Sequence, residues 1–171
     1  MDLSKFDLIR VSKKIPELRM MLWISHDKPL VKNPHGFRAN EQQGIRMTSV
    51  SILLHWENEP FNSGKWDGLV FTGVSGCSEK DTFEKKDGFN RAYGRACQKL
   101  VNWYLTSNPE SLLDQYKPDL VLHNLHEKDI KDVNGWISKH AFEAKLGFAQ
   151  RVFQARLAHK VEKEESATSA I

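Results

Sequence analysis

The chain has 171 residues, a formal net charge of +3, 40% hydrophobic residues and 27% charged residues. This length suits one domain that buries about 70% of its unfolded surface, and the composition is that of an ordinary globular protein. Two cysteines are too few for a disulfide scaffold, and no apolar run approaches the ~18 residues of a membrane span. We therefore expect a single domain over residues 1–165, located in the cytoplasm and without a membrane partner.

The first 45 residues are irregular apart from one short apolar run at residues 18–24, which we predict to form a strand. Prolines and glycines then mark a long loop over residues 27–44. Loops of this length inside a compact domain are commonly functional.

The clearest strand signal covers residues 48–57, which alternate and are rich in β-branched and apolar side chains. The stretch FNSGKWDG supplies turn residues, and a second strand follows at residues 69–75. A hairpin of two strands is only marginally stable in water, so further strands must complete a sheet. The candidates are residues 18–24 and residues 117–125.

Two helices are predicted from apolar residues that recur at three- and four-residue spacing. The first covers residues 89–106, and the second is a long helix from residue 134 or 135 to about residue 164. We expect a disordered tail over residues 166–171, which are polar. The predicted fold class is α+β, with an antiparallel sheet built on a central hairpin and packed by the middle helix and the long C-terminal helix.

The long helix carries an apolar stripe whose spacing is close to that of a coiled-coil seam. Its members are Phe142, Leu146, Ala149, Phe153 and Leu157. Two interpretations stay open: the stripe packs against a helix of a second subunit, or it covers its own domain. The first interpretation predicts a homo-oligomer, and we expect this assembly.

Three cations of the middle helix, Arg91, Arg95 and Lys99, lie four residues apart and therefore line one stripe. Cations at the beginning of a helix face the positive end of its dipole, which is unfavourable unless an anion offsets them. Helix N-termini bind anions through free N–H groups, and arginine side chains match phosphate oxygens. The pattern predicts a site for a phosphate-bearing ligand, and Asn90 and Lys80 join it from the same end.

An alternative interpretation is a solvated basic face, or ion pairs of these cations with Glu84 and Asp87. Gly94, between the two arginines, costs about 1 kcal/mol in a helix relative to alanine. Such a glycine indicates the close approach of a ligand or of another backbone, and packing against the hairpin would explain it equally well.

Trp66 lies in the hairpin turn beside Lys65, where an aromatic ring next to a cation can stack a base, so Trp66 joins the ligand-binding set. His123 and His126 form an H-x-x-H pair, but the zinc-enzyme motif H-E-x-x-H is absent. The sequence also lacks a phosphate-binding loop and a nucleophile elbow. We therefore predict no catalytic residue, no metal and no cofactor, and nothing in the sequence supports an enzyme.

C-x-x-K-D at residues 77–81, followed by F-N-R-x-x-G-R at residues 89–95, resembles a strand-to-helix signature of small phage-encoded proteins. Some of those proteins are similar to the Thoeris anti-defence family, which sequesters cyclic ADP-ribose signals made by bacterial immune systems. The resemblance implies an antiparallel sheet with C-terminal helices, assembled as an oligomer. It also implies that Arg91 and Arg95 contact phosphate or orient the helix.

Three functions remain as expectations. The first is a non-enzymatic, phage-type protein that captures a phosphate-bearing ligand, in its sharpest version a cyclic nucleotide immune signal in the host cytoplasm. The second is a nucleic-acid-binding protein. It would use the basic residues Lys5, Arg10, Lys13, Lys14 and Arg19. The third is a host-protein interaction module that acts through the long C-terminal helix.

Overall fold

A computed structural model describes most of the chain. The described residues are 19–31, 43–57, 64–77, 81–106 and 118–169. The elements are β1 (Arg19–Asp27), β2 (Leu30–Val31), β3 (Gln43–Gly44), β4 (Met47–Glu57), β5 (Lys65–Gly76), α2 (Lys85–Thr106), β6 (Leu120–His126), a 3-10 turn (Glu127–Asp129) and α3 (Ile130–Ser169). Most of the predicted loop at residues 27–44 lies outside the described residues.

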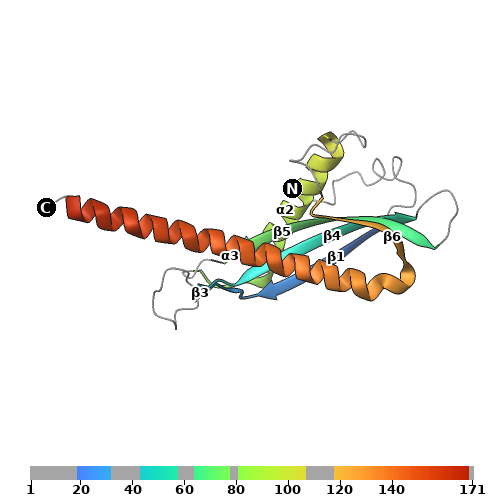
Figure 1. The fold of residues 1–171 in the computed structure, drawn as a ribbon, viewed down its shortest axis with the longest axis horizontal. Coiled ribbons are helices and arrows are strands. Elements are labelled where there is room, and N and C mark those ends of the chain that lie inside the picture. Colours follow the sequence, from blue (N-terminus) through green and yellow to red (C-terminus); the bar gives the residue numbers. More distant parts are fainter. Residues whose placement is uncertain (1–18, 32–42, 58–63, 78–80, 107–117, 170–171) are drawn as a thin grey trace.

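A four-stranded antiparallel sheet with the order β1-β4-β5-β6 forms the centre of the molecule. The predicted hairpin is its middle pair, with Val50 opposite Gly73. The two segments proposed to complete the sheet are its outer strands, β1 and β6. Together with α2 and α3, this sheet confirms the predicted α+β fold class (Figure 1).

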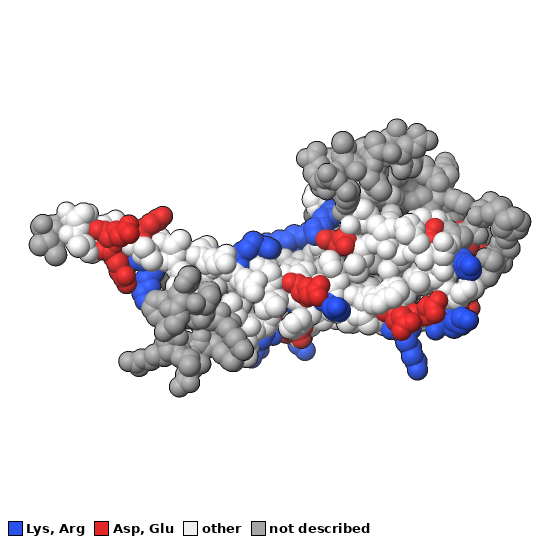
Figure 2. Space-filling model, in the orientation of Figure 1, with Lys and Arg blue, Asp and Glu red and all other residues white. Residues whose placement is uncertain are grey.

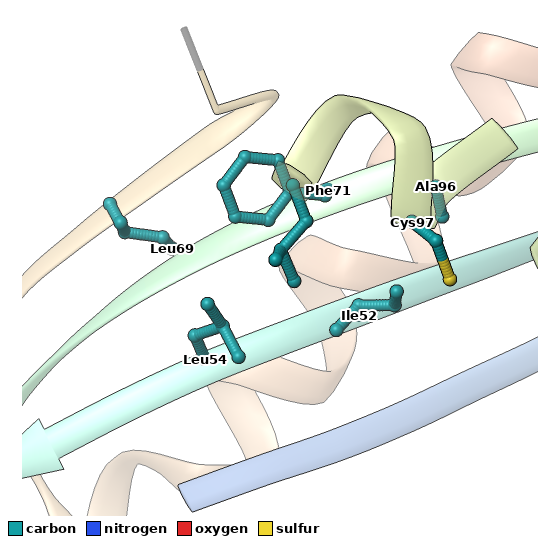
Figure 3. Close-up of a cluster of buried hydrophobic side chains, with 7 residues drawn as sticks. Ile52, Leu54, Leu69, Phe71, Ala96 and Cys97 are labelled. Atoms are coloured by element: carbon teal, nitrogen blue, oxygen red, sulfur yellow. The ribbon is translucent and has the colours of Figure 1, made fainter. Parts of the chain in front are cut away.

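Helix α2 packs against one face of β4 and β5 over an apolar cluster. The buried members are Ile52, Leu54, Leu69, Phe71, Ala96, Cys97 and Leu100, most of which are labelled in Figure 3. Gly73 of β5 makes this contact close, because a Cβ there would lie 2.0 Å from the carbonyl oxygen of Ala92 and 2.5 Å from the amide of Ala96. The backbone of α2 therefore lies directly on the strand.

Helix α3 crosses the opposite face of the sheet, since it contacts the side chains that alternate with those under α2. Its buried positions recur at every fourth residue. They are Val133, Ile137, Ala141, Lys145, Ala149 and Phe153. Leu53 and Val70 meet the beginning of this row, and Met47 meets its end, so the fold has three layers (Figure 1).

The long helix is longer than the sequence predicted, with 40 residues and a length of about 60 Å. It begins at Ile130 rather than at residue 134, and it continues to Ser169 through part of the tail that we expected to be disordered. Beyond Phe153 its side chains are exposed apart from the half-buried Leu157, and Figure 1 shows this end projecting past the sheet.

The coiled-coil-like stripe of α3 covers its own domain over most of its length. Ala149 and Phe153 are buried against Val31 and Met47, with Leu146 and Leu157 packed around them. Phe142, in contrast, is 48% exposed. These contacts favour the second of the two interpretations for the stripe.

Candidate functional site

Arg91, in the second turn of α2, lines a pocket of about 380 Å³ between the start of this helix, the start of β4 and the end of β5. We call it the α2 pocket. Its lining residues are Thr48, Ser75, Gly76, Cys77, Asp81, Thr82, Phe83, Glu84, Asp87, Gly88 and Arg91.

The first turn of α2 is fixed to the sheet through Gly88. A Cβ at this position would lie 2.5 Å from the hydroxyl oxygen of Thr48, so only glycine permits the approach. The Ser75 hydroxyl donates a hydrogen bond of 2.8 Å to the carbonyl oxygen of Gly88. Because the first N–H groups of a helix lack partners within it, this docking places the positive end of the α2 dipole beside the pocket.

A second hollow adjoins the α2 pocket and shares Cys77, Asp81, Thr82 and Phe83 with it. Arg46, which lies just before β4, lines this hollow, and its guanidinium carbon lies 5.4 Å from the centroid of the Phe83 ring. Phe83 therefore lines both hollows, with Arg91 on the α2 pocket and Arg46 on the adjoining hollow.

His26 of β1 lies beside the same ring, with the two ring centroids 6.0 Å apart in an edge-to-face arrangement. Its Nδ1 atom and the Thr48 hydroxyl are 2.8 Å apart. Burial lowers the pKa of His26, and the charges of Lys85 and Lys145 lower it further. His26 is therefore neutral at neutral pH and adds no positive charge to the site.

The formal charges around the two hollows are mixed. Lys28, Arg46 and Arg91 are the cations, and Asp81, Glu84 and Asp87 are the carboxylates. Arg91 in the α2 pocket or Arg46 in the adjoining hollow can bind an anionic group, and the carboxylates can accept hydrogen bonds from hydroxyl or amino groups. The arrangement suits a ligand that carries both kinds of group.

The other two cations of the stripe fasten α2 to the sheet. Strand β6 pairs with β5 only as far as Val70, so the edge of β5 beyond it needs other partners. The Arg95 guanidinium donates a hydrogen bond to the carbonyl oxygen of Val74 on this edge. Lys99 Nζ lies 3.1 Å from a carboxylate oxygen of Asp119, which itself accepts the Thr72 amide at 2.6 Å.

Asp119 joins this edge of the sheet to both helices. Burial alone would raise its pKa, but His140, the Thr72 amide and Lys99 outweigh burial, and the net pKa lies below its usual value. The carboxylate is therefore charged at neutral pH and holds Lys99 in place, so Lys99 of α2 has a structural partner in Asp119, just before β6.

The structure does not bring the remaining predicted residues to the α2 pocket. Trp66 lies at the far end of β5 and packs on the α3 face of the sheet. Asn90 is exposed on α2 and does not line the pocket, and Lys80 lies outside the described residues. A Cβ at Gly94 would meet no atom within 4 Å, so close packing against the hairpin does not explain this glycine.

Sequence reasoning missed two residues of the site, Arg46 and Phe83. Arg46 belongs to no pattern along the chain, and the pairing of β4 with β5 brings it to the adjoining hollow, where the Cys77 amide donates a hydrogen bond of 2.8 Å to the Arg46 carbonyl. Phe83 lies in the sequence between the C-x-x-K-D motif and the F-N-R motif. This position between the two motifs was the only signal that could have pointed to Phe83 as a site residue.

Comparisons with protein-family models, curated proteins and solved structures find no match for the chain. No helix among the described residues is long and apolar enough to cross a membrane. Within the same part of the chain, no three His, Cys, Asp or Glu side chains lie together as metal ligands would.

Proposed function

We propose that the protein is a non-enzymatic binding protein that captures a small phosphate-bearing ligand in the α2 pocket. The observation that carries the proposal is that three anion- or base-binding elements lie around the α2 pocket and the hollow that adjoins it. These elements are the N-terminus of α2, the guanidinium groups of Arg91 and Arg46, and the ring of Phe83.

The mixed charges favour a nucleotide over a simple anion. Guanidinium groups and helix N–H groups bind phosphate oxygens, and an aromatic ring beside them can stack a base. Asp81, Glu84 and Asp87 would repel a bare anion, but they accept hydrogen bonds from ribose hydroxyls or base amino groups.

The sharpest version of the proposal is a phage-type anti-defence protein that sequesters a cyclic nucleotide immune signal in the host cytoplasm. Its support is the resemblance to the Thoeris anti-defence family, together with the place of the motif residues. Cys77 and Asp81 from the first half-motif and Arg91 from the second line the same pocket.

Native mass spectrometry of the protein purified from its natural host background tests for a retained mass of a few hundred daltons. Calorimetric titration with cyclic ADP-ribose then compares Arg91→Ala with Arg95→Ala, a matched control one turn along the same helix. We expect Arg91→Ala to weaken binding at least tenfold, because a charge-assisted phosphate contact is lost. Arg95→Ala should lower the melting temperature and keep the affinity, because its guanidinium contacts Val74.

Two results would contradict the proposal. One is an Arg91→Ala protein that binds as tightly as the unchanged protein. The other is the absence both of a retained mass and of binding to cyclic ADP-ribose.

The projecting end of α3 favours a second candidate function, a host-protein interaction module. Residues 158–169 are exposed on the part of α3 that projects past the sheet, so a partner could bind this surface. Truncation after Leu157 should then abolish the biological activity while the melting temperature stays within a few degrees. Under the first proposal the same truncation leaves ligand binding intact.

The nucleic-acid alternative rests on basic residues that, except for Arg19, lie outside the described residues. On the face that Figure 2 shows, basic and acidic side chains are interspersed, and the described residues of this face form no continuous basic surface. We therefore place this alternative below the other two.

A further inference from the structure

Another pocket lies at the opposite end of the sheet from the α2 pocket and under the beginning of α3. Its volume is about 170 Å³. Trp23 and Trp66 line it together with the His55 ring, and Leu53 and Val133 belong to the buried cluster beneath. We call it the indole pocket.

The local sequence of β5 creates this pocket. The pairing of β5 with β6 shifts register between Trp66 and Gly68. A Cβ at Gly68 would lie 3.1 Å from the Trp66 ring and 2.8 Å from a methyl group of Leu53. The glycine therefore leaves room for the indole to lie back over its own strand, where its centroid is 5.3 Å from that of His55.

The walls and the rim of the indole pocket differ in polarity. The walls are mostly apolar and aromatic, whereas Arg19, Lys65, Glu57 and Glu127 supply two cations and two carboxylates around them. Burial lowers the pKa of His55, and the nearby Arg19 lowers it further, so the imidazole is neutral at neutral pH. The formal charges of the lining sum to zero, which favours neither an anion nor a cation.

We propose that the indole pocket is a second ligand site, which binds a neutral planar heteroaromatic ring of the nucleobase class. Stacking between aromatic side chains stabilises any base through its π-face, and the polar rim supplies both donors and acceptors for the edge of the ring. The volume is smaller than the roughly 300–1,000 Å³ of sites for drug-sized ligands, which agrees with a single ring system.

This site is independent of the α2 pocket. Trp66 and Gly76 lie at the two ends of β5, ten residues apart, which is roughly 30 Å along a strand. The indole pocket also lies on the α3 face, whereas Arg91 belongs to α2 on the other face. One small nucleotide cannot occupy both pockets, so Trp66 binds a different molecule, or a different part of a large one.

The test uses the full chain and two uncharged nucleosides, adenosine and uridine, as probes. Nuclear magnetic resonance follows the indole N–H signals of the tryptophans, each assigned by a Trp→Phe substitution. We expect saturable shifts at Trp23 and Trp66 with at least one nucleoside, and none at Trp136, which is exposed on α3 away from the pocket.

Two variants of exposed positions on α3 separate pocket binding from surface binding. Asn134→Phe places a ring in the pocket, because Asn134 lines it, and should weaken nucleoside binding at least tenfold. Ser138→Phe adds the same ring one turn along the helix and should leave binding unchanged. Arg91→Ala should also leave it unchanged, which distinguishes failure at this site from failure at the α2 pocket.

The proposal is overturned if neither nucleoside shifts the Trp23 or Trp66 signals in a saturable way. It is also overturned if Asn134→Phe and Ser138→Phe bind equally well, since binding would then occur outside the pocket.

Discussion

The two faces of the sheet hold their helices in different ways. On the α2 face the contact is apolar and very close, because Gly73 brings the strand against the backbone at Ala92 and Ala96. On the α3 face a polar row lies in the middle of the contact. It consists of Ser25, Ser49, Ser51, Thr72 and Lys145. The first face tolerates no added volume, whereas the second depends on satisfied polar groups.

Lys145 is the centre of the polar row. Its side chain is 1% exposed, and its Nζ donates a hydrogen bond of 2.6 Å to the Ser25 hydroxyl and forms an ion pair with Asp27. The Ser25 and Ser49 hydroxyls are 2.9 Å apart, so the row continues into the sheet. A buried charge with these partners fixes the position of α3 more than it adds stability, because desolvation opposes the attraction.

The largest expected effect tests the close contact of α2. In Gly73→Ala the new methyl group would overlap the backbone of α2, and the helix must move away from the sheet. We expect the free energy of unfolding to fall by roughly 3 kcal/mol, at the upper end of the range for overpacked cores. Urea denaturation measures this, and a loss below about 1 kcal/mol would show that the α2 face also tolerates added volume.

The next effect is a pH dependence that tests the polar row. Burial lowers the pKa of Lys145 from its ordinary value of 10.5 to about 8. Between these pH values the unfolded chain holds a proton that the folded chain has released, so stability from this group rises with pH. The slope is at most about 1.4 kcal/mol per pH unit.

Urea denaturation at pH 7.5, 8.5 and 9.5 measures this slope as the difference between the unchanged protein and Lys145→Met, which keeps the length of the side chain without its charge. The difference should move in favour of the unchanged protein as pH rises. A difference that stays constant over this range would mean that the ion pair with Asp27, rather than burial, sets the pKa of Lys145, because a pKa at or above 10.5 keeps both the folded and the unfolded chain protonated there.

The contrast between the two faces also explains which parts of the fold could be predicted from the sequence. The alternation of apolar and polar residues over residues 48–57 and 69–75 predicted the hairpin. A shift of one residue in the pairing would turn every side chain to the other face, so this pattern also restricts the register. The start of α2 was placed four residues too late, because Gly88 normally weakens a helix and its contact with Thr48 is tertiary. Lys145 was missed because lysine is almost never fully buried without partners, and here the partners come from β1.

The candidate site was predicted less completely than the fold. The spacing of Arg91, Arg95 and Lys99 correctly placed them on one stripe, but it could not indicate that Arg95 and Lys99 have partners at the edge of β5. Those partners depend on where β6 stops pairing. Trp66 was grouped with the arginines because it follows Lys65 in a predicted turn. In the structure it is half-buried on the α3 face, at the other end of β5 from the α2 pocket.

The smallest expected effect concerns Gly94, whose surroundings are the reverse of those at Gly73. A Cβ at Gly94 meets no atom within 4 Å, so Gly94→Ala should raise the free energy of unfolding by about 0.5–1 kcal/mol through the helix propensity of alanine. Urea denaturation without ligand measures this gain, and a loss of stability would mean that α2 lies closer to another part of the chain.

The same variant then examines the function of α2, because the methyl group would project from the turn that joins Arg91 to Arg95. If Gly94→Ala is more stable but binds cyclic ADP-ribose more weakly, a ligand must approach the backbone at Gly94, and the α2 pocket extends along the helix. If binding is unchanged, the ligand is confined to the part of α2 before Gly94, as far as Arg91.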